Sequence, residues 1–554
     1  MEKTDREPYA LLGDEAVALG GLHAGISAAY GYPGTPSTEI MAFLIAEHER
    51  GGPPARWCAN EKTALEAGLG VSFAGKRALV TMKHVGLNVA ADPFVNAALT
   101  GTGGGLVIAA ADDPGMHSSQ NEQDSRFYAA FALVPCLEPR SQEEAYRMTR
   151  EAFDLSERFG MPVLLRLTTR LCHARAGVTP EAARERNRTS EVRDKTRWSL
   201  IPAFARRGYR RLIDRQPELL EWSATHKANA IEWGEDPSFV VLTSGVAGNY
   251  YEENKADLAA APTRIHIGAY PLPPDLLRKA CEGAGRVLVL EEGQPFIEER
   301  LRGILPVPLS VSGRLTGAVS RDGELDPDTV RAALGLAPRK NILSDGGITL
   351  PDLPPRPPQL CQGCPHRDSY ETILLAGAGL APLSINADIG CYSLGALPPY
   401  EAVDSIVCMG ASVGMARGAA DAGIPYALGI IGDSTFLHSG MTGLIDAAAS
   451  DTPMTLIILD NSSVAMTGCQ DPVLPSESLR ALLVGLGVPP EHILELEAKK
   501  QRIEENARLL RREIMHPGLS VAVFRRECLE AARKRRKKQG HAGETARETE
   551  EKDA

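Results

Sequence analysis

Two apolar runs, each followed at once by a polar group, constrain the fold of this chain most. Residues 426–431 (YALGII) precede Gly-Asp433, and residues 455–459 (TLIIL) precede Asp-Asn461. Continuous apolar runs of this length are typical of strands buried on both faces of a parallel sheet. The interval from Asp433 to Asn461 is long enough for a crossover helix and a neighbouring strand. Both groups are therefore expected at the carboxyl edge of an α/β sheet, where such sheets bind ligands.

The residue types at this edge suit a hard metal ion. A carboxylate, an amide oxygen and a backbone carbonyl are oxygen ligands for Mg²⁺, which is often held partly by the phosphates of a bound molecule. The alternative is two ordinary junctions between a strand and a loop, because short motifs also arise by chance.

Composition and charge exclude several classes of protein. The 554 residues predict several domains, and 43% hydrophobic with 24% charged residues is ordinary for a globular chain. The net charge of −11 argues against a nucleic-acid partner. The charged N-terminus has no apolar signal region, and no run is long enough to span a membrane, so we expect a cytoplasmic protein. In that compartment the ten cysteines favour metal or catalytic roles over disulfides wherever they cluster.

Alternating apolar runs and helical segments predict an α/β fold with two doubly wound parallel-sheet domains on either side of a smaller α/β domain. The strands are expected at 78–81, 105–111, 162–167, 239–245, 264–268, 286–290, 426–431, 455–459 and 519–524. The expected segments are a first domain at 1–180, a charged helical connector at 181–235, a second domain at 236–335, a Pro-rich linker at 336–358, a third domain at 359–530 and a disordered charged tail at 531–554.

The first domain carries polar groups after its predicted strands. Glu61 lies at the start of a segment with helical spacing, where the helix dipole stabilises a carboxylate; an ordinary surface glutamate is the alternative. Residues 31–38 are rich in turn formers, and residues 111–126 form a long polar stretch after a strand. A polar loop of that length in an apolar domain is more often functional than not.

These motifs together resemble one family. The chain is similar to the thiamine-diphosphate-dependent alpha subunit of indolepyruvate ferredoxin oxidoreductase, in the 2-oxoacid:ferredoxin oxidoreductase superfamily. The matching stretches run in the family's order across nearly the whole chain: 32–37, 60–61, 82–92, 111–115, 117–126, 361–367, 388–392, 408–411 and 432–436. The resemblance implies a thiamine-diphosphate-binding fold, with a pyrimidine-binding domain first, a transketolase-C-like domain second and a diphosphate-binding domain third.

The resemblance also implies roles for individual residues. Glu61 would hydrogen-bond the aminopyrimidine of thiamine diphosphate and support its imino tautomer, and Thr35 would touch the substrate. Asp433, Asn461 and the Ser463 carbonyl would bind Mg²⁺. The implied cofactor-binding set is completed by Gly390, Gly432 and Ser434.

Three further polar residues are our candidates for binding the substrate carboxylate or coenzyme A (CoA). They are Lys83, His84 and Arg126, all in the matching stretches of the first domain. Ordinary polar surface residues are the alternative, because position in a sequence does not fix a catalytic role.

Four cysteines fit the family's arrangement for one [4Fe–4S] cluster. Cys361 and Cys364 form a CxxC pair, Cys391 follows in an Ile-Gly-Cys turn, and Cys528 comes after the last apolar run. Four thiolates from separate loops can hold such a cluster. The alternatives are small core residues, or a zinc site at Cys361 and Cys364. We interpret the remaining cysteines as core or incidental residues: Cys58, Cys136, Cys172, Cys281, Cys408 and Cys469.

The implied function is oxidative decarboxylation of an aryl 2-oxoacid, such as indolepyruvate or phenylpyruvate, to an acyl-CoA. The reaction would run through a thiamine-diphosphate carbanion, and the proximal cluster would pass electrons singly to ferredoxin or a similar carrier. The implied partner is a small beta subunit of the gamma-type oxidoreductase fold, in a heterodimer or a dimer of heterodimers. Many alpha subunits of this family also carry a ferredoxin-like domain with two further cysteine sets. No such set follows Cys528, so we expect electrons to leave the cluster directly or through another subunit.

Two other functions stay open at this point. A non-oxidative thiamine-diphosphate-dependent decarboxylase or ligase would need Glu61, Asp433 and Asn461 but no cluster. A non-catalytic scaffold subunit is the third possibility, and the intact cofactor motifs argue against it.

Overall fold

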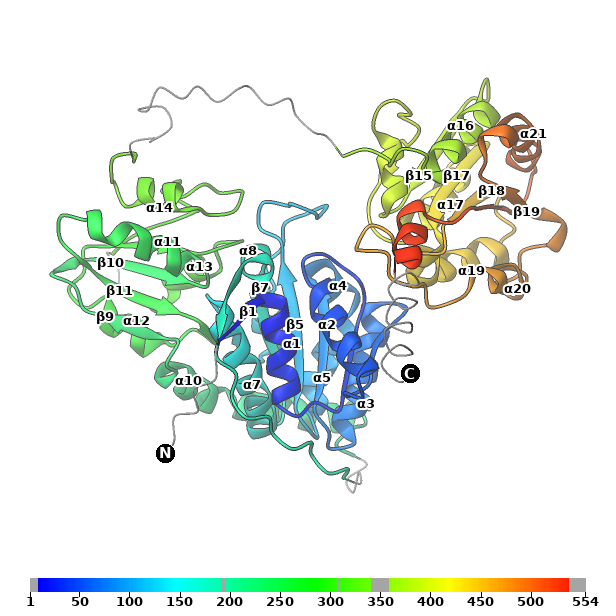
Figure 1. Cartoon of the computed structure of the whole chain (residues 1–554). Coiled ribbons are helices and arrows are strands. Elements are labelled where there is room, and N and C mark those ends of the chain that lie inside the picture. Colours follow the sequence, from blue (N-terminus) through cyan, green and yellow to red (C-terminus); the bar gives the residue numbers. More distant parts are fainter. Residues whose placement is uncertain (1–7, 191–195, 306–308, 340–357, 538–554) are drawn as a thin grey trace, which may run out of the picture. The chain divides into compact units, whose positions relative to one another are not determined.

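The computed structural model describes residues 8–190, 196–305, 309–339 and 358–537. The chain divides into two compact units, Met1–Pro351 and Asp352–Ala554 (Figure 1). Each unit is described by itself below. Within the described residues, no helix is both long and apolar enough to cross a membrane.

The first unit contains a seven-stranded sheet in the order β12-β6-β7-β5-β4-β2-β3, parallel except for β12. Its strands are β2 (Ala28–Gly31), β3 (Ala55–Trp57), β4 (Ala78–Lys83), β5 (Leu106–Asp112), β6 (Cys136–Leu137), β7 (Val163–Thr168) and β12 (Ala269–Tyr270). Every residue of β4, β5 and β7 is buried, as expected for strands covered on both faces.

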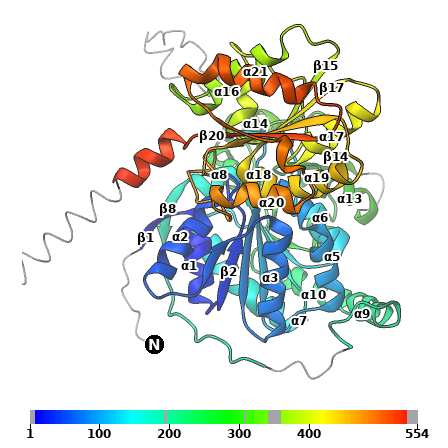
Figure 2. The ribbon, with the colours of Figure 1, turned by 90° about the vertical axis from the view of Figure 1, so that its right-hand side faces the viewer.

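Helices cover both faces of this sheet, as Figure 2 shows for α1 and α2 on one side and α3 and α5 on the other. Gly21 of α1 packs on the Leu79 side chain, whereas Gly68 of α3 packs on Val80, its neighbour on the opposite face. The helices are α1 (Gly13–His23), α2 (Thr38–Glu49), α3 (Glu61–Phe73), α4 (His84–Val89), α5 (Ala91–Thr100), α6 (Arg126–Ala132), α7 (Gln142–Phe159) and α8 (Thr169–His173). A separate antiparallel pair joins β1 (Tyr9–Leu12) to β8 (Arg175–Val178).

A five-stranded sheet completes the first unit, in the order β14-β13-β10-β11-β9 and parallel except for β9. Its strands are β9 (Ala230–Glu232), β10 (Asp236–Ser244), β11 (Pro262–Ile267), β13 (Arg286–Leu290) and β14 (Ser310–Ser312). Its helices and connecting helices are α9 (Pro202–Asp214), α10 (Gln216–Thr225), α11 (Ala247–Asn254), η1 (Lys255–Asp257), α12 (Pro274–Ala280), α13 (Phe296–Ile304) and α14 (Pro327–Ala333).

The two sheets of the first unit are linked by β12 and share one core. β12 follows β11 in the chain, yet it pairs antiparallel with β6 of the seven-stranded sheet, Ala269 opposite Leu137. One continuous hydrophobic core extends through both sheets. The smaller α/β region is therefore built onto the edge of the larger one.

The second unit is a six-stranded parallel sheet in the order β16-β15-β17-β18-β20-β19, with a hydrophobic cluster on each face. Its strands are β15 (Leu383–Ala387), β16 (Ser405–Ile406), β17 (Tyr426–Gly432), β18 (Met454–Asp460), β19 (Ile493–Glu497) and β20 (Ser520–Arg525). Its helices are α16 (Pro365–Gly377), η2 (Cys391–Ala396), α17 (Ala411–Asp421), α18 (Asp433–Thr435), η3 (Phe436–Gly440), α19 (Met441–Ala449), η4 (Ser476–Ser478), α20 (Leu479–Gly485), η5 (Pro490–His492), η6 (Lys500–Arg502) and α21 (Ile503–Ile514).

The predicted α/β class with parallel sheets is confirmed, and all nine predicted strands are present as β4, β5, β7, β10, β11, β13, β17, β18 and β20. The connector segment contains α9 and α10 but also contributes β9 to the second sheet. Most of the predicted linker, 340–357, lies outside the described residues, and so does 538–554 of the predicted tail. Residues 529–537 are helical, so the helix continues past the position where the tail was expected to start.

Candidate active-site groups

In the first unit, predicted site residues gather where β2, β4 and β5 end. Thr35 lies in the loop after β2, and its carbonyl accepts a hydrogen bond from the Ser118 hydroxyl at 3.2 Å. The Nζ atom of Lys83 donates to the Ser118 carbonyl at 2.8 Å. The Nε2 atom of His84 lies 3.2 Å from the Asn121 carbonyl. The long polar loop after β5 therefore contacts all three predicted residues.

Lys83 is buried at this edge, with its aliphatic stem beside Gly34. Burial lowers the pKa of Lys83 to about 8, and the negative charge of Asp113 opposes the decrease. Asp113 in turn accepts hydrogen bonds from the Ser118 amide at 2.8 Å and from the Thr169 hydroxyl at 2.6 Å. Lys83 is thus a cation whose charge is readily lost at mildly alkaline pH.

Glu61 begins α3 and is only 4% exposed. The helix start is fixed by Asn60, whose side chain accepts a hydrogen bond from the Thr63 amide at 2.9 Å. The Glu61 side chain lies against Gly86 of α4 so closely that a Cβ at Gly86 would be 2.5 Å from Oε1. The Asn60 cap thus fixes the start of the helix that carries Glu61, and the lack of a side chain at Gly86 leaves room for the Glu61 carboxylate.

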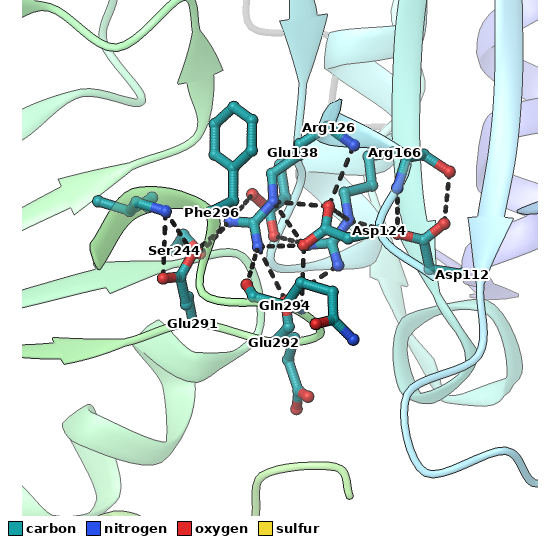
Figure 3. A network of polar contacts seen from close by, with 12 residues as sticks. Asp112, Asp124, Arg126, Glu138, Arg166, Ser244, Glu291, Glu292, Gln294 and Phe296 are labelled. Carbon is teal, nitrogen blue, oxygen red and sulfur yellow. Dashed lines mark hydrogen bonds and ion pairs between the residues drawn. The ribbon is translucent and has the colours of Figure 1, made fainter. Parts of the chain in front are cut away.

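Arg126 does not lie in this group. Its side chain is completely buried and its guanidinium contacts Asp124 at 2.5 Å, Glu291 at 3.1 Å and Ser244 at 3.3 Å (Figure 3). Arg166 lies beside it and binds the carboxylates of Asp112 and Glu138. The hypothesis that Arg126 binds substrate is therefore replaced by a structural role, because acidic groups from both sheets of the first unit already occupy its donors.

In the second unit, Asp433 and Asn461 lie at the carboxyl ends of the adjacent strands β17 and β18. Both are buried, and the Oδ2 atom of Asp433 has no hydrogen-bond partner among the described residues. The same holds for the Oγ atom of Ser434. Burial, and then the negative charge of Asp460, raise the pKa of Asp433 to about 7, although the amides of Ser434 and Ser462 oppose the increase.

His366 orients Asn461, and sequence reasoning missed it. The Nε2 atom of His366 lies 3.2 Å from Nδ2 of Asn461, and burial lowers the pKa of His366 to about 4. A neutral imidazole can accept this hydrogen bond, so Nδ2 is the donor and the amide orientation is fixed. The Oδ1 atom of Asn461 accepts from the Ser463 amide at 3.0 Å. The signal in the sequence was a histidine two residues after the CxxC pair.

The glycines predicted to bind cofactor surround one aromatic ring. A Cβ at Gly390 would be 2.4 Å from the Tyr392 ring, and a Cβ at Gly432 would be 2.8 Å from it. The Tyr392 side chain is buried, and its hydroxyl donates to the Ile389 carbonyl at 3.2 Å. Neither position can accept a side chain without moving this ring, so both glycines leave room for Tyr392.

The four predicted cluster cysteines lie near one another in the second unit. Burial raises the pKa of Cys364 to about 11, and the thiols of Cys361 and Cys528 add to the increase. Burial also raises the pKa of Cys391 to about 12, with contributions from Cys364, Cys528 and Cys361. The Cys528 amide donates to the Asn461 carbonyl at 3.0 Å, which connects this group to the proposed magnesium ligands.

A fifth cysteine lies in the same group. Burial raises the pKa of Cys469, and its next largest cause is the neighbouring Cys528. Cys469 was interpreted as incidental because it belongs to no family motif. Its neighbour in space could not be read from sequence, since 469 and 528 come from loops after different strands.

Comparisons with known proteins identify the family of the chain. A family model described as "Pyruvate flavodoxin/ferredoxin oxidoreductase, thiamine diP-bdg" matches residues 20–205, and one described as "Thiamine pyrophosphate enzyme, C-terminal TPP binding domain" matches 388–481. A solved 2-oxoglutarate:ferredoxin oxidoreductase from Magnetococcus marinus aligns with a TM-score of 0.48 and 17% identity over 56% of this chain and 63% of that chain. The fold and the family matches define an enzyme subunit of the thiamine-diphosphate-dependent 2-oxoacid oxidoreductases.

Comparison with curated relatives identifies the family of this chain within that enzyme class. The indolepyruvate oxidoreductase subunit IorA of Methanothermobacter thermautotrophicus is 36% identical, over 94% of this chain and 86% of its own length. The IorA subunit of Archaeoglobus fulgidus is 35% identical, over 98% of this chain and 89% of its own length. The chain belongs to the IorA family of indolepyruvate oxidoreductase subunits.

Proposed function

We propose that this chain is the catalytic, thiamine-diphosphate-binding subunit of a 2-oxoacid:ferredoxin oxidoreductase that acts on aryl 2-oxoacids of the indolepyruvate type. A 2-oxoacid and CoA give an acyl-CoA, CO₂, one proton and two electrons, and the electrons leave singly to ferredoxin or a similar carrier. The names of the IorA relatives support the substrate class. The small beta subunit as partner, in a heterodimer or a dimer of heterodimers, is part of the same proposal, and the cytoplasmic location stays a prediction.

The unpartnered Oδ2 atom of Asp433 carries this proposal. A buried carboxylate oxygen without a hydrogen bond is costly unless a cation binds it. Asp433, the Oδ1 atom of Asn461 and the Ser463 carbonyl are the oxygen types that Mg²⁺ binds together with phosphates. The residues fit the group, and we assign Asp433, Asn461 and Ser463 to Mg²⁺, with Gly390, Gly432 and Ser434 beside the diphosphate of thiamine diphosphate.

The first unit supplies the acid–base and substrate groups. The Glu61 carboxylate would accept a hydrogen bond from the ring N–H of the cofactor's pyrimidine and so favour the imino form of that ring. When bound, thiamine diphosphate supplies the electron sink that decarboxylation of a 2-oxoacid requires. Lys83 offers a cation for the substrate carboxylate, with Thr35 and His84 at the same sheet edge. The buried position of Glu61 also keeps water away from this hydrogen bond to the pyrimidine.

The cysteine group supports a [4Fe–4S] cluster over a zinc site. Zinc needs thiolates at about 2.3 Å from one ion and hence roughly 4 Å from one another. Among the described residues, the group of His, Cys, Asp and Glu side chains whose ligand atoms lie within 4.8 Å of one another does not include these cysteines. A cluster uses one thiolate for each iron, so wider spacing suits it. We assign Cys361, Cys364, Cys391 and Cys528 as its ligands.

The test is anaerobic purification of the full chain with its beta subunit, followed by measurement of iron, sulfide and ferredoxin reduction with indolepyruvate and CoA. We expect about four irons per chain, as one [4Fe–4S] centre requires. Cys364→Ser should remove the iron absorbance and stop ferredoxin reduction, but spare part of any slow release of aldehyde. Stoichiometric zinc without iron would contradict the oxidative function and support the non-oxidative decarboxylase.

The fourth ligand needs a matched pair of variants because Cys469 lies beside Cys528. We expect Cys528→Ser to lose the cluster and Cys469→Ser to keep it. If Cys469→Ser loses the iron and Cys528→Ser keeps it, Cys469 is the ligand and only that assignment is wrong.

A further inference from the structure

Three side chains from three helices of the first unit converge outside the groups described above. Asp14 comes from the first turn of α1, Glu39 from the first turn of α2 and His173 from the end of α8. One ligand atom of each lies within 4.8 Å of the others. No motif of the family resemblance includes them, and the sequence places them far apart.

Asp14 is the member of this group whose burial most requires a compensating charge. It is completely buried, and neither of its carboxylate oxygens receives a hydrogen bond from an N–H or O–H group among the described residues; the Cys172 thiol and the Glu39 carboxyl lie beside it. Burying a carboxylate in this state costs several kcal/mol unless a charge or a proton compensates it.

Glu39 adds a second unsatisfied oxygen to the same place. Its Oε2 atom is buried without a hydrogen bond, and the nearest ion-pair partner is Nε2 of His173 at 3.6 Å. Within the described part of the chain, no lysine or arginine forms an ion pair with Asp14 or Glu39. Three carboxylate oxygens therefore converge with one imidazole and no fixed cation.

We propose that Asp14, Glu39 and His173 bind a divalent transition-metal ion, and that Zn²⁺ is the ion that fits best. Zn²⁺ accepts both imidazole nitrogen and carboxylate oxygen as ligands, so all three side chains can bind it. The imidazole disfavours Mg²⁺ and Ca²⁺, which select oxygen ligands alone. The dipositive ion balances the two carboxylates. The side chains of His173 and Glu39 are 37% and 43% exposed, so the ion can enter from solvent.

The position of the group indicates a structural ion. His173 ends the short helix α8, and Thr169 at the start of α8 donates to Asp113 at 2.6 Å. Asp113 accepts from the Ser118 amide, whose carbonyl binds Lys83. An ion that fixes α8 to α1 and α2 therefore also fixes the base of the polar loop around Lys83. This role does not depend on the reaction that the enzyme performs.

The test titrates Zn²⁺ into the full chain by calorimetry, with thiamine diphosphate and Mg²⁺ present throughout. Asp14→Asn and His173→Ala remove ligands, and His48→Ala on α2 is the matched control, because it removes an imidazole from the same helix as Glu39. Asp14→Asn replaces an unpartnered carboxylate by a neutral group of the same shape, so it should fold. Any binding by the cysteines is common to all variants and cancels in the comparison.

We expect the wild type and His48→Ala to bind one Zn²⁺ more than Asp14→Asn and His173→Ala, or to bind it at least about tenfold more tightly. Zn²⁺ should raise the melting temperature of the wild type and the control, but not of the two ligand variants. Equal stoichiometry and affinity in all four proteins would overturn the proposal and leave a proton as the compensating charge. Selective binding of Mn²⁺ in place of Zn²⁺, lost in the same variants, would support the site and correct the ion.

Discussion

Gly86 and Glu61 are in direct contact, since a methyl group at Gly86 would lie 2.5 Å from Oε1 of Glu61. The two residues belong to α4 and α3, which follow different strands of the same sheet. The absence of one side chain therefore sets the position of the carboxylate that the proposed mechanism needs.

Gly86→Ala should consequently lower turnover strongly while the protein stays folded. Alanine is compatible with the helical backbone of α4, so the expected damage is displacement of Glu61, and a misplacement of about 1 Å costs roughly 100-fold in rate. Steady-state kinetics with saturating thiamine diphosphate would measure it, with Gly70→Ala on α3 as a control whose added Cβ meets open space. Wild-type turnover in Gly86→Ala would show that Glu61 is not positioned in this way.

The lowered pKa of Lys83 predicts that KM for the 2-oxoacid depends on pH. Because its pKa is lowered to about 8, the side chain is a cation below that pH and neutral above it. If Lys83 binds the substrate carboxylate, KM for the 2-oxoacid should rise as the pH increases through 8. Lys83→Arg should move this rise to higher pH, because a guanidinium stays charged.

The control for Lys83 is Lys62→Met, which removes an exposed lysine at the start of α3. It should keep the wild-type profile of KM against pH. Identical profiles for the wild type and Lys83→Arg would remove Lys83 from the substrate site.

Asp433→Asn should weaken cofactor binding without destabilising the folded protein. The variant loses a hard anionic ligand, so the affinity for thiamine diphosphate should fall about tenfold or more, and excess Mg²⁺ should not restore it. The cofactor-free variant should be at least as stable as the wild type, because a buried unpartnered carboxylate is gone.

Calorimetry and thermal unfolding measure the two effects of Asp433→Asn. Asp446→Asn, on the exposed side of α19, should change neither. Unchanged cofactor affinity in Asp433→Asn would disprove the metal assignment.

Arg126→Met should destabilise the first unit rather than weaken substrate binding. Removing one partner of a buried ion pair typically costs about 3–5 kcal/mol, because the other charges stay buried without compensation. Denaturant unfolding would show the loss, and KM measured at low temperature should be unchanged. Arg300→Met, which removes a half-buried arginine beside Phe296, should cost much less. A stable Arg126→Met variant with a raised KM would restore the original substrate hypothesis.

The sequence predicts the strands well because each is a continuous apolar run, and burial on both faces leaves little ambiguity. It also places Asp433 and Asn461 correctly at strand ends. It could not predict the surroundings of Arg126, because the acidic partners come from loops that follow strands of both sheets. Cys469 and the group of Asp14, Glu39 and His173 were missed for the same reason, since only the folded chain brings them together.

The pairing of β12 with β6 means that the boundary near residue 180 is not a place where the chain can be cut. A fragment ending there would leave β6 as an open edge with unpaired backbone groups, which promotes aggregation. Arg126 would also lose Glu291, and Asp124 would lose the hydrogen bond from the Gln294 amide. The first two α/β regions of this protein are therefore expected to fold only together, as a single unit with one hydrophobic core.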